Sequence, residues 1–442
     1  MSTVDHTSTA VTPGDAHTVK VRSSEIAIGV IIGRISEFFD FFVFGIASVV
    51  VFPQVFFPFA SAMTGTLYSF IVFSFAFVAR PIGSLIFRVI HERYGRGTKL
   101  TIALFMLGTA TAGIAFLPGY AELGNASIVL LALLRIAQGI ALGGSWDGLP
   151  SLLALNVPQN KRGWYAMIPQ LGAPIGFIIA AALFVFLIDN LSAEDFISWG
   201  WRYPFYVAFS INVVTLFARL RLVMTPEFTQ LLKTRELEPS PLRELVRTQG
   251  DNIALGAFAP LASYALFHLV SVFALSWVLL FTKQSLTDFL LVQILGAAIA
   301  VPCMIASGKI ADRIGRRNTL MIGAVMIGVY SGWTPVLLSG STMGGYMFIL
   351  LGFALLGFSH AQAAGAVNAS FSAKYRYSGA VLTSDLGWLT GAAFAPLIAL
   401  LLAVKLGVGY VGLYLLSGAA ATLLALRINR SLEERRDDES AA

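Results

Sequence analysis

Ionisable side chains stand inside several of the long apolar runs of this sequence. Arg34, Glu37 and Asp40 follow one another at three-residue steps in the first run, and Arg135 and Asp385 lie in two later runs. An ionised group at the centre of a helix in lipid costs about 2.5 to 3.5 kcal/mol, so it must pair with another group or face a polar cavity. A carboxyl group beside a guanidinium can take up a proton when an anion occupies that guanidinium instead, because the positive charge no longer stabilises the carboxylate. These residues therefore predict proton exchange coupled to the binding of an anion.

Each of these residues is assigned a specific role. We expect Glu37 or Asp40 to carry the proton, Arg135 to bind the anionic group of the substrate, and Asp385 to supply a second acidic contact. Asp385 is thus a candidate both for proton coupling and for substrate binding. The alternative is structural, because Arg34 and Glu37 have the i, i+3 spacing of an ordinary ion pair on one helix face.

A wider set of polar and aromatic residues is expected to line the same site. Gln170-Leu171-Gly172 in one apolar run echoes Asp385-Leu386-Gly387 in another, which would place Gln170 opposite Asp385. His268 and His360 also lie in apolar runs, where a lone histidine is more often a packing residue than a proton relay. The candidate substrate-binding residues are Arg34, Arg135, Gln138, Gln170, Tyr264, Asp385 and Trp388.

Helices that cross a membrane must position these residues. Of the 442 residues, 57% are hydrophobic and only 12% are charged, about half the charged share of a soluble domain. A bilayer core of roughly 30 Å needs about 20 apolar residues of helix, because every backbone amide in lipid must be bonded within its own segment. The sequence therefore predicts an all-α membrane protein with twelve transmembrane helices in two pseudo-symmetric six-helix bundles. The twelve apolar runs are 25–50, 63–90, 98–118, 126–156, 163–190, 203–222, 252–283, 286–311, 317–339, 342–371, 376–404 and 409–427.

The positive charges predict the orientation of these helices. All but six of the 30 Lys and Arg residues fall on one side of the membrane, and positively charged loops stay on the cytoplasmic side. We therefore expect both termini in the cytoplasm and a multi-pass protein of the cell membrane, the inner membrane of a bacterium. Arg80 and Asp147 are expected to join the cytoplasmic ends of helices. The predicted parts are a cytoplasmic tail (1–24), a six-helix bundle (25–222), a cytoplasmic linker (223–251), a second six-helix bundle (252–427) and a cytoplasmic tail (428–442).

A short charged motif occurs at the same place in each half of the chain. Glu92-Arg93-Tyr94-Gly95-Arg96 stands between the second and third runs, and Asp312-Arg313-Ile314-Gly315-Arg316 stands between the eighth and ninth. The two motifs are 220 residues apart, about half of the chain. Such side chains can lock neighbouring helix ends in one state and release them in another, whereas the simpler interpretation is a basic loop that sets topology. The candidate gating residues are Glu92, Arg93, Arg96, Asp312, Arg313, Arg316 and Arg317.

At these residues the sequence resembles the major facilitator superfamily, whose secondary transporters consist of two six-helix halves around a central cavity. Residues 308–317 follow the family's G-x-x-x-D-R-x-G-R-R signature, and Arg135-Ile136-Ala137-Gln138-Gly139 is similar to its R-x-x-Q-G element. Within the superfamily the chain is most similar to the metabolite:proton symporters, through residues 33–45, 80–83, 199–205 and 225–228. The resemblance implies proton-coupled symport of a small organic anion or zwitterion by alternating access.

The sequence departs from the family pattern at several positions. In the first copy of the loop signature, Arg88 stands where the first glycine belongs, and Glu92 replaces the aspartate. In the fourth run, residues 143–148 place an acid, Asp147, two residues after the usual glutamate position. Two residues turn a helix by about 200°, so this acid points to a different side. Asp385 stands where glutamine is common in the family. These departures fall where substrate choice is expected to be decided, so the family's substrates do not transfer to this chain.

Several alternatives remain beside the symporter. Within transporters, a sugar carrier or a drug exporter is the second interpretation; from a different class, the chain could be a membrane-embedded sensor or a membrane enzyme. The sequence has no Walker A loop, no His-Glu-x-x-His and no metal-ligand cluster, which argues against an enzyme and a metal site. We expect no cofactor, with the proton gradient as the driving force. The expected partners are a small metabolite, protons and membrane lipid, with no nucleic acid, and a monomer as the functional unit.

Overall fold

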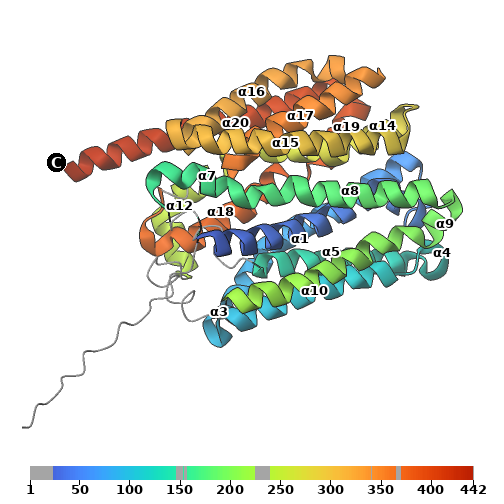
Figure 1. Cartoon of the computed structure of the whole chain (residues 1–442), viewed down its shortest axis with the longest axis horizontal. Coiled ribbons are helices and arrows are strands. Elements are labelled where there is room, and N and C mark those ends of the chain that lie inside the picture. The colour runs from blue at the N-terminus through green and yellow to red at the C-terminus, as the bar shows by residue number, and fades with distance from the viewer. Residues whose placement is uncertain are drawn as a thin grey trace, which may run out of the picture.

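Helices account for nearly all of the described chain. The computed structural model describes residues 23–145, 153, 157–223, 239–339, 341–364 and 370–441. The long helices run side by side along the long axis of the molecule (Figure 1). Those of the N-terminal half form one group, and those of the C-terminal half form a second group packed against the first.

The N-terminal half contains the first six spans. The third span follows the second without a loop, because α3 runs through both and turns at Gly95, whose φ of 83° favours glycine. The fifth span is broken near its start, where Pro169 lies in a 3-10 turn. The elements are α1 (Ser23–Val50), α2 (Phe52–Val55), α3 (Ala62–Phe116), α4 (Tyr120–Leu123), α5 (Asn125–Gly144), η1 (Gln159–Lys161), α7 (Arg162–Met167), η2 (Ile168–Leu171), α8 (Gly172–Asn190), α9 (Ala193–Ser198), η3 (Gly200–Arg202) and α10 (Tyr203–Val223).

The C-terminal half repeats this plan. Its first span is broken at Pro260 and again by a π-helical turn, and its fifth span is broken between α18 and α19. The elements are α12 (Leu242–Phe258), α13 (Leu261–His268), η4 (Leu269–Phe273), α14 (Ala274–Phe281), α15 (Leu286–Ile314), α16 (Arg316–Leu337), α17 (Thr342–Ala363), η6 (Ala373–Tyr375), α18 (Arg376–Gly391), α19 (Ala395–Lys405) and α20 (Gly409–Ala441).

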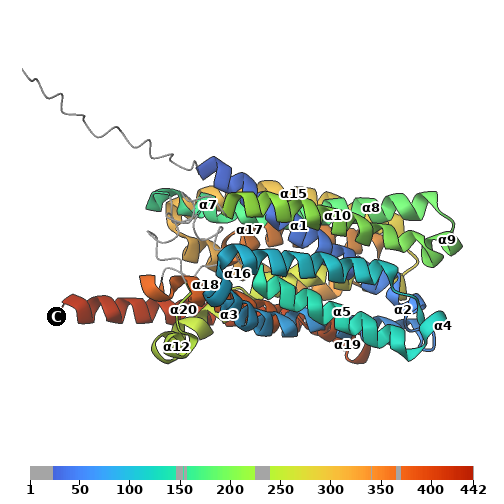
Figure 2. The same cartoon turned by 90° about the horizontal axis from the view of Figure 1, so that it is seen from below.

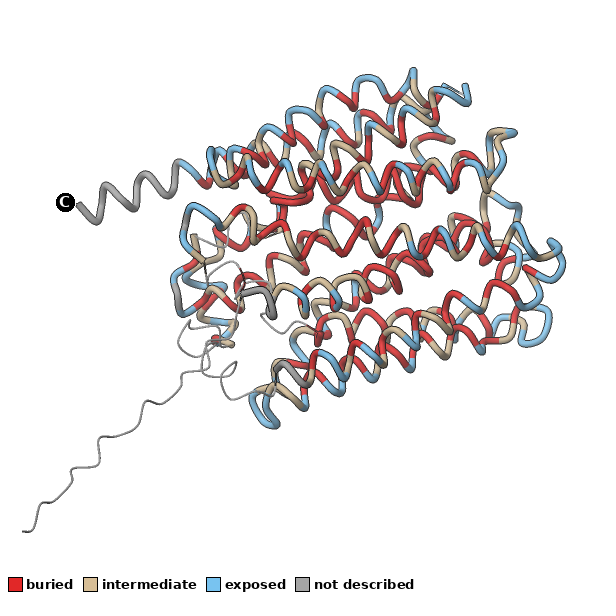
Figure 3. Tube along the Cα trace, viewed as in Figure 1, coloured by how far each residue is buried: buried red, intermediate tan, exposed pale blue. Residues whose placement is uncertain are grey.

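The helices have the length and apolar character needed to cross a bilayer. Ten stretches of the described chain qualify by length and composition, and α3 is long enough for two crossings. With α1, which is 28 residues long, they give the twelve spans that the sequence predicts. Large apolar side chains are exposed on the outer faces, such as Phe105, Phe217 and Val329, while buried positions face other helices (Figure 3). An outer surface of this kind is suited to contact with lipid.

The two ends of the bundle differ in what they contain. We call one end the linker end; it contains α7, α12 and the C-terminal part of α20. The opposite end, which we call the loop end, contains α4 and α9 (Figures 1 and 2). At the loop end Thr287 Oγ1 donates a hydrogen bond to Asp189 Oδ1 at 2.9 Å, which joins α15 of one half to α8 of the other. The broken fifth and eleventh spans both contact the opposite half, α7 against α15 and α18 against α3. The interface between the halves is therefore built from helices with interruptions.

Candidate functional site

Aromatic rings fill the centre of the interface between the two halves. We call this set the aromatic core. Phe38 of α1 lies 5.8 Å from Phe267 and 6.3 Å from Trp388, measured between ring centroids. Tyr264 stacks on Trp388 at 4.2 Å, with an angle of 18° between the ring planes. The N-terminal half contributes Phe38, Phe41, Phe42, Phe73 and Phe77, and the C-terminal half contributes Tyr264, Phe267, His268, His360 and Trp388.

A chain of hydrogen bonds joins Arg135 to Asp40 in the N-terminal half. Arg135 Nη1 donates to Gln138 Oε1 at 3.0 Å, and Gln138 Nε2 donates to Thr111 Oγ1 at 2.8 Å. Thr111 Oγ1 in turn donates to Asp40 Oδ1 at 2.9 Å. All four residues are buried. Each donor in this chain points toward the carboxylate, so a change at the guanidinium can be transmitted to Asp40.

The Arg135 guanidinium makes few other polar contacts. It lies 3.8 Å from the ring centroid of Phe44 and 5.1 Å from that of Phe73, and its Nε donates to the Phe73 carbonyl at 3.3 Å. Its Nη2 is buried without a hydrogen-bond partner, and no carboxylate of the described chain lies within ion-pair distance. Gln138, which was expected in the substrate site, instead links Arg135 to Thr111. Arg135 therefore retains one free donor for an anion.

Glu37 is held by two guanidiniums. Arg34 Nη1 and Arg219 Nη1 lie 2.8 and 2.9 Å from its two carboxylate oxygens, which confirms the i, i+3 pair of Arg34 with Glu37. Arg219 Nη2 also donates to the Ser145 carbonyl at 2.7 Å. Arg219 lies near the end of the apolar run 203–222, but it was not among the residues predicted for the site. Gly33 leaves room for this arginine, because a Cβ atom there would lie 3.3 Å from Arg219 Cδ.

Asp385 connects the two halves at a point nearer to the linker end. Its carboxylate accepts a hydrogen bond from Arg80 Nε at 2.7 Å and another from the Ser84 hydroxyl, both on α3. The structure thus places Arg80, and not Gln170, opposite Asp385. Gln170 is buried in η2, and its Oε1 has no hydrogen-bond partner. Asp147, which was grouped with Arg80, lies outside the described residues.

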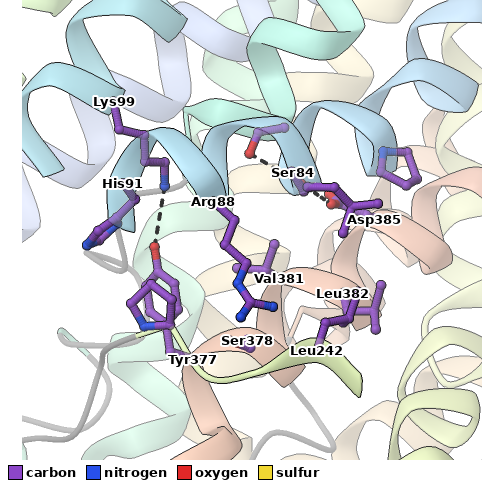
Figure 4. Close-up of a pocket in the computed structure, with 14 residues that line it drawn as sticks. Ser84, Arg88, His91, Lys99, Leu242, Tyr377, Ser378, Val381, Leu382 and Asp385 are labelled. Carbon is purple, nitrogen blue, oxygen red and sulfur yellow. Dashed lines mark hydrogen bonds between the residues drawn. The ribbon is translucent and has the colours of Figure 1, made fainter. Parts of the chain in front are cut away.

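A cavity of about 140 Å³ lies beside this ion pair at the linker end (Figure 4). Its walls come from α3, α12 and α18, and they are mostly apolar. Cationic side chains and a histidine stand among them: Arg88, His91 and Lys99. Burial, helped by the positive charges of Lys99 and Arg96, lowers the pKa of His91 to about 4. This histidine is therefore neutral at pH 7, in surroundings that disfavour a further positive charge.

The second copy of the charged loop motif contacts the opposite half directly. Asp312 Oδ1 accepts a hydrogen bond from the backbone N–H of Trp164 at 3.0 Å, at the start of α7. The N-cap residue of that helix, Lys161, makes no capping hydrogen bond with its side chain. Asp312 therefore caps the helix from the other half. Gln362 Nε2 donates a hydrogen bond to the Gly163 carbonyl at 3.2 Å. Arg316 Nε donates to Gln362 Oε1 at 3.0 Å. Arg317 binds Asn429 Oδ1 at 2.8 Å within its own half.

The first copy of the motif makes fewer such contacts. Glu92 is exposed and pairs with Arg88 of the same helix at 2.9 Å, and Arg93 is exposed. Arg96 lies 5.9 Å from the ring centroid of Tyr377 in the other half, and Lys99 Nζ lies 3.5 Å from the hydroxyl oxygen of that tyrosine. In this conformation Glu92 and Arg93 do not join helix ends of the two halves, so their gating role stays a prediction. The same holds for Arg313, which is also exposed.

The two predicted aromatic contacts, Tyr264 and Trp388, both lie in the aromatic core. They are buried and stack on each other, so in this conformation they contact rings and not an open cavity. Within the described ranges, no three His, Cys, Asp or Glu side chains gather as a metal site would require. The chemistry that the arrangement offers is ion pairing, anion binding and proton exchange.

Comparisons with known proteins agree with this architecture. The family model described as Major Facilitator Superfamily matches residues 30–385. The chain is 36% identical over 412 residues to the Inner membrane metabolite transport protein YhjE of Escherichia coli (strain K12), covering 91% of this chain and 93% of that protein. It is 29% identical over 439 residues to the Shikimate transporter of the same organism, covering 96% and 99%.

A solved structure has the same fold. The xylose transporter XylE from E. coli, in a partially occluded inward open conformation, superposes with a TM-score of 0.68. The match covers 91% of this chain and 97% of that one at 18% sequence identity. At this level of identity the likeness concerns the fold.

Proposed function

Because this chain belongs to the Major Facilitator Superfamily, a family of transporters and not of enzymes, we propose that it carries a small organic anion or zwitterion across a membrane together with a proton. The proton gradient drives the transport, and no cofactor takes part. The functional unit is a monomer embedded in lipid. The linker end faces the cytoplasm, which agrees with the excess of Lys and Arg in its loops.

The observation that carries this proposal is the hydrogen-bond chain from Arg135 to Asp40. The positive charge of Arg135 helps to keep Asp40 ionised. An anion that binds Arg135 Nη2 partly neutralises this charge, so the Asp40 carboxylate is less stabilised. Protonation of Asp40 then costs less free energy, so anion and proton bind together. A protonated Asp40 and a neutralised Arg135 also remove two charges from the interior, which eases the movement of the halves past each other.

The same geometry separates the two acidic candidates in α1. Glu37 lies within 2.9 Å of two guanidiniums, an arrangement that holds a carboxylate in its charged form. Asp40 has one hydrogen bond, from a neutral hydroxyl, and its guanidinium is two side chains away. We therefore assign the proton to Asp40 and a fixed structural charge to Glu37. Asp385, which pairs with Arg80 across the interface, has the role of a gate in this scheme.

Alternating access requires the contacts between the halves to break at one end at a time. At the linker end these contacts include the Arg80–Asp385 ion pair and the Asp312–Trp164 hydrogen bond. At the loop end the Asp189–Thr287 hydrogen bond joins the halves. A bound substrate changes the balance between these states only through a difference in its affinity for them.

Reconstituted vesicles test the proposal. Purified protein in liposomes is given a panel of radiolabelled organic acids that includes shikimate, the substrate named for one relative. We expect accumulation only with an inward proton gradient. Asp40→Asn should abolish accumulation but retain counterflow, since exchange needs no net proton movement. Arg135→Lys should weaken binding about tenfold or more, because a point charge cannot replace a planar fork of donors.

Glu37→Gln is the matched control. Removing the charge of Glu37 leaves Arg34 and Arg219 without their shared partner, so we expect lower stability with the proton dependence preserved. Accumulation that ignores the proton gradient would leave a facilitator or an exchanger. Proton-dependent accumulation by Asp40→Asn would exclude Asp40 as the coupling group.

A further inference from the structure

Two histidines of the aromatic core have none of the hydrogen bonds that buried imidazoles normally make. His268 and His360 are fully buried, and neither ring nitrogen of either residue has a hydrogen-bond partner. Their neighbours are aromatic rings, and Phe267 lies 5.4 Å from both. Trp388 lies 6.3 Å from His268 and 6.2 Å from His360. Four buried polar atoms without partners are costly, so an arrangement of this kind needs an explanation.

The backbone next to His268 is irregular as well. His268 ends α13, and residues 269–273 form a π-helical turn before α14 begins. Gln293 Nε2 of α15 donates to the carbonyls of Val270 and Ser271 at 2.6 and 3.0 Å, which satisfies backbone groups of the widened turn. Short π-helical turns inside α-helices occur frequently at functional sites. The turn is a second, independent sign of a site at this place.

Polar atoms without partners also surround the same rings on the side of the N-terminal half. They are Arg135 Nη2 and Arg34 Nε. Arg135 and His268 both face Phe73, at 5.1 and 5.5 Å from its ring centroid. Arg34 and His360 both approach Phe38, at 4.8 and 6.4 Å. The unsatisfied donors and acceptors therefore form one group around the aromatic core.

The charges in this group specify the substrate further. Arg34 and Arg219 are committed to Glu37, and Arg80 is committed to Asp385. Arg135 is the fourth guanidinium of this region, and of the four it alone has no carboxylate of the described chain within 4.0 Å. One such guanidinium matches one carboxylate. Tyr264 and Trp388 stack on each other, and Phe267 meets Trp388 edge-on; flat faces and ring edges of this kind match a flat ring.

We propose that His268 and His360 form a specificity subsite that hydrogen-bonds the uncharged polar groups of a ring-bearing monocarboxylate, while Arg135 holds its carboxylate. The proposal rests on the proposed transport function and names the class of substrate. A neutral imidazole can donate through one nitrogen and accept through the other, which suits a hydroxyl group. Bound substrate supplies the partners that the imidazoles lack.

The conformation described here has no room for such a substrate. The cavity beside His360 measures about 10 Å³, enough for one water-sized sphere, and it is enclosed by Phe42, Phe267 and Phe353 among others. The rings of the two halves therefore fill the space that the substrate would occupy. Substrate enters when the halves separate, and closure around it replaces ring-to-ring contacts with ring-to-substrate contacts.

Binding measurements on purified protein test this subsite without a proton gradient. The probes are 4-hydroxybenzoate, benzoate, which lacks the hydroxyl, and glutarate, an open-chain dianion. We expect the wild type to bind 4-hydroxybenzoate about tenfold more tightly than benzoate and glutarate weakest, because a buried hydrogen-bonding group left unpaired weakens binding. His268→Phe, His360→Phe and the double variant should lose this preference while still binding benzoate.

Thermal unfolding of the ligand-free variants gives a second readout. Replacing an imidazole without partners by an apolar ring removes buried unsatisfied polar atoms, so each variant should raise the Tm by about 2 to 4 °C. A purely structural histidine would lower it. Tyr330→Phe is the matched control: this buried hydroxyl of the same half donates to the Phe348 carbonyl at 2.7 Å, so its loss should lower the Tm and leave binding unchanged.

The results that overturn the subsite are distinct from those that overturn proton coupling. An unchanged preference for 4-hydroxybenzoate in the double variant, or a lowered Tm with unchanged affinity, removes the histidines from the site. Tighter binding of glutarate, or no binding of either ring acid, removes the proposed substrate class. Proton-independent accumulation in vesicles would refute the transport mechanism and leave these binding results standing.

Discussion

The two copies of the charged loop motif meet the opposite half of the protein in different ways. In the second copy, Asp312 caps α7, and the chain comes so close that a Cβ atom on Gly163 would lie 2.6 Å from Ala311 Cβ. In the first copy, Glu92 is exposed, and a cavity of about 140 Å³ lies among α3, α12 and α18. One side of the linker end is therefore a tight seam, and the other is loosely packed.

Residue size explains much of this difference. Gly308, Ala311 and Asp312 of the second copy correspond to Arg88, His91 and Glu92 of the first. A Cβ atom on Gly308 would lie 3.3 Å from Met167 Cε and 3.4 Å from Trp164 Cα, so the glycine lets α7 approach closely, whereas the larger Arg88 and His91 line the cavity. On the loosely packed side the halves are joined by the Arg80–Asp385 ion pair, by Ser84, which donates to the same carboxylate, and by Lys99 near the Tyr377 hydroxyl. The same motif can therefore form a tightly or a loosely packed contact between the halves, depending on the residues around it.

The tight seam predicts the largest effect. Gly163→Val places a branched side chain where even a Cβ atom would lie 2.9 Å from the Asp312 backbone nitrogen, so α7 and α15 must move apart. We expect uptake to fall about 100-fold or more, because the linker end can no longer close. Cysteine accessibility of the linker end should rise. Gly332→Val is the control, since a Cβ atom there has nothing within 4 Å. Equal losses of uptake in both variants would show that transport does not depend on the close packing at Gly163.

The loosely packed side predicts the next effect. Arg80→Gln or Asp385→Asn leaves one charge of a mostly buried pair without its partner, which should lower the free energy of unfolding by about 2 to 4 kcal/mol. The double variant should lose less than the sum of the two single losses. A double-mutant cycle on thermal unfolding in detergent measures this coupling. Additive losses would mean that the pair does not hold the two halves together.

Asp312→Ala and Glu92→Ala compare the two motif copies directly. Asp312→Ala removes the cap of α7 from the other half, which should cost about 1 kcal/mol and shift the protein toward linker-end opening. Glu92→Ala removes an exposed pair within one helix, worth less than about 0.5 kcal/mol. Transport rates and thermal unfolding of both variants check this ranking. A larger effect of Glu92→Ala would reverse the comparison.

The smallest effect concerns the pH response of the loosely packed side. The pKa of His91 falls from 6.5 to about 4 on folding, so the unfolded chain binds this proton more readily than the folded one. The stability that His91 contributes is complete above pH 6.5 and is lost as the pH falls toward 4. His91→Phe should reduce the loss of Tm across that window by about 1 to 2 °C. Identical pH profiles of variant and wild type would contradict the prediction.

Much of the fold was predictable from local patterns. Long apolar runs and their charge bias gave the helices, because the lipid requirement for internal backbone hydrogen bonds acts on each segment by itself. The Arg34–Glu37 pair was predictable for the same reason, since i, i+3 spacing brings two side chains of one helix together. The role of Arg219 was not, because its partner lies on α1, 182 residues earlier in the chain.

The sequence by itself determined that the chain crosses a membrane twelve times, that its halves repeat, and that charged residues lie within its spans. Only the tertiary structure decided which charges meet: Asp385 with Arg80, Arg219 with Glu37, and Asp40 with Arg135 through two neutral side chains. The physical reason is that helix formation and insertion depend on a segment's own residues. Partners on different helices depend on how those helices rotate and pack, and small residues such as Gly33 and Gly163 decide that through contacts between segments far apart in the chain.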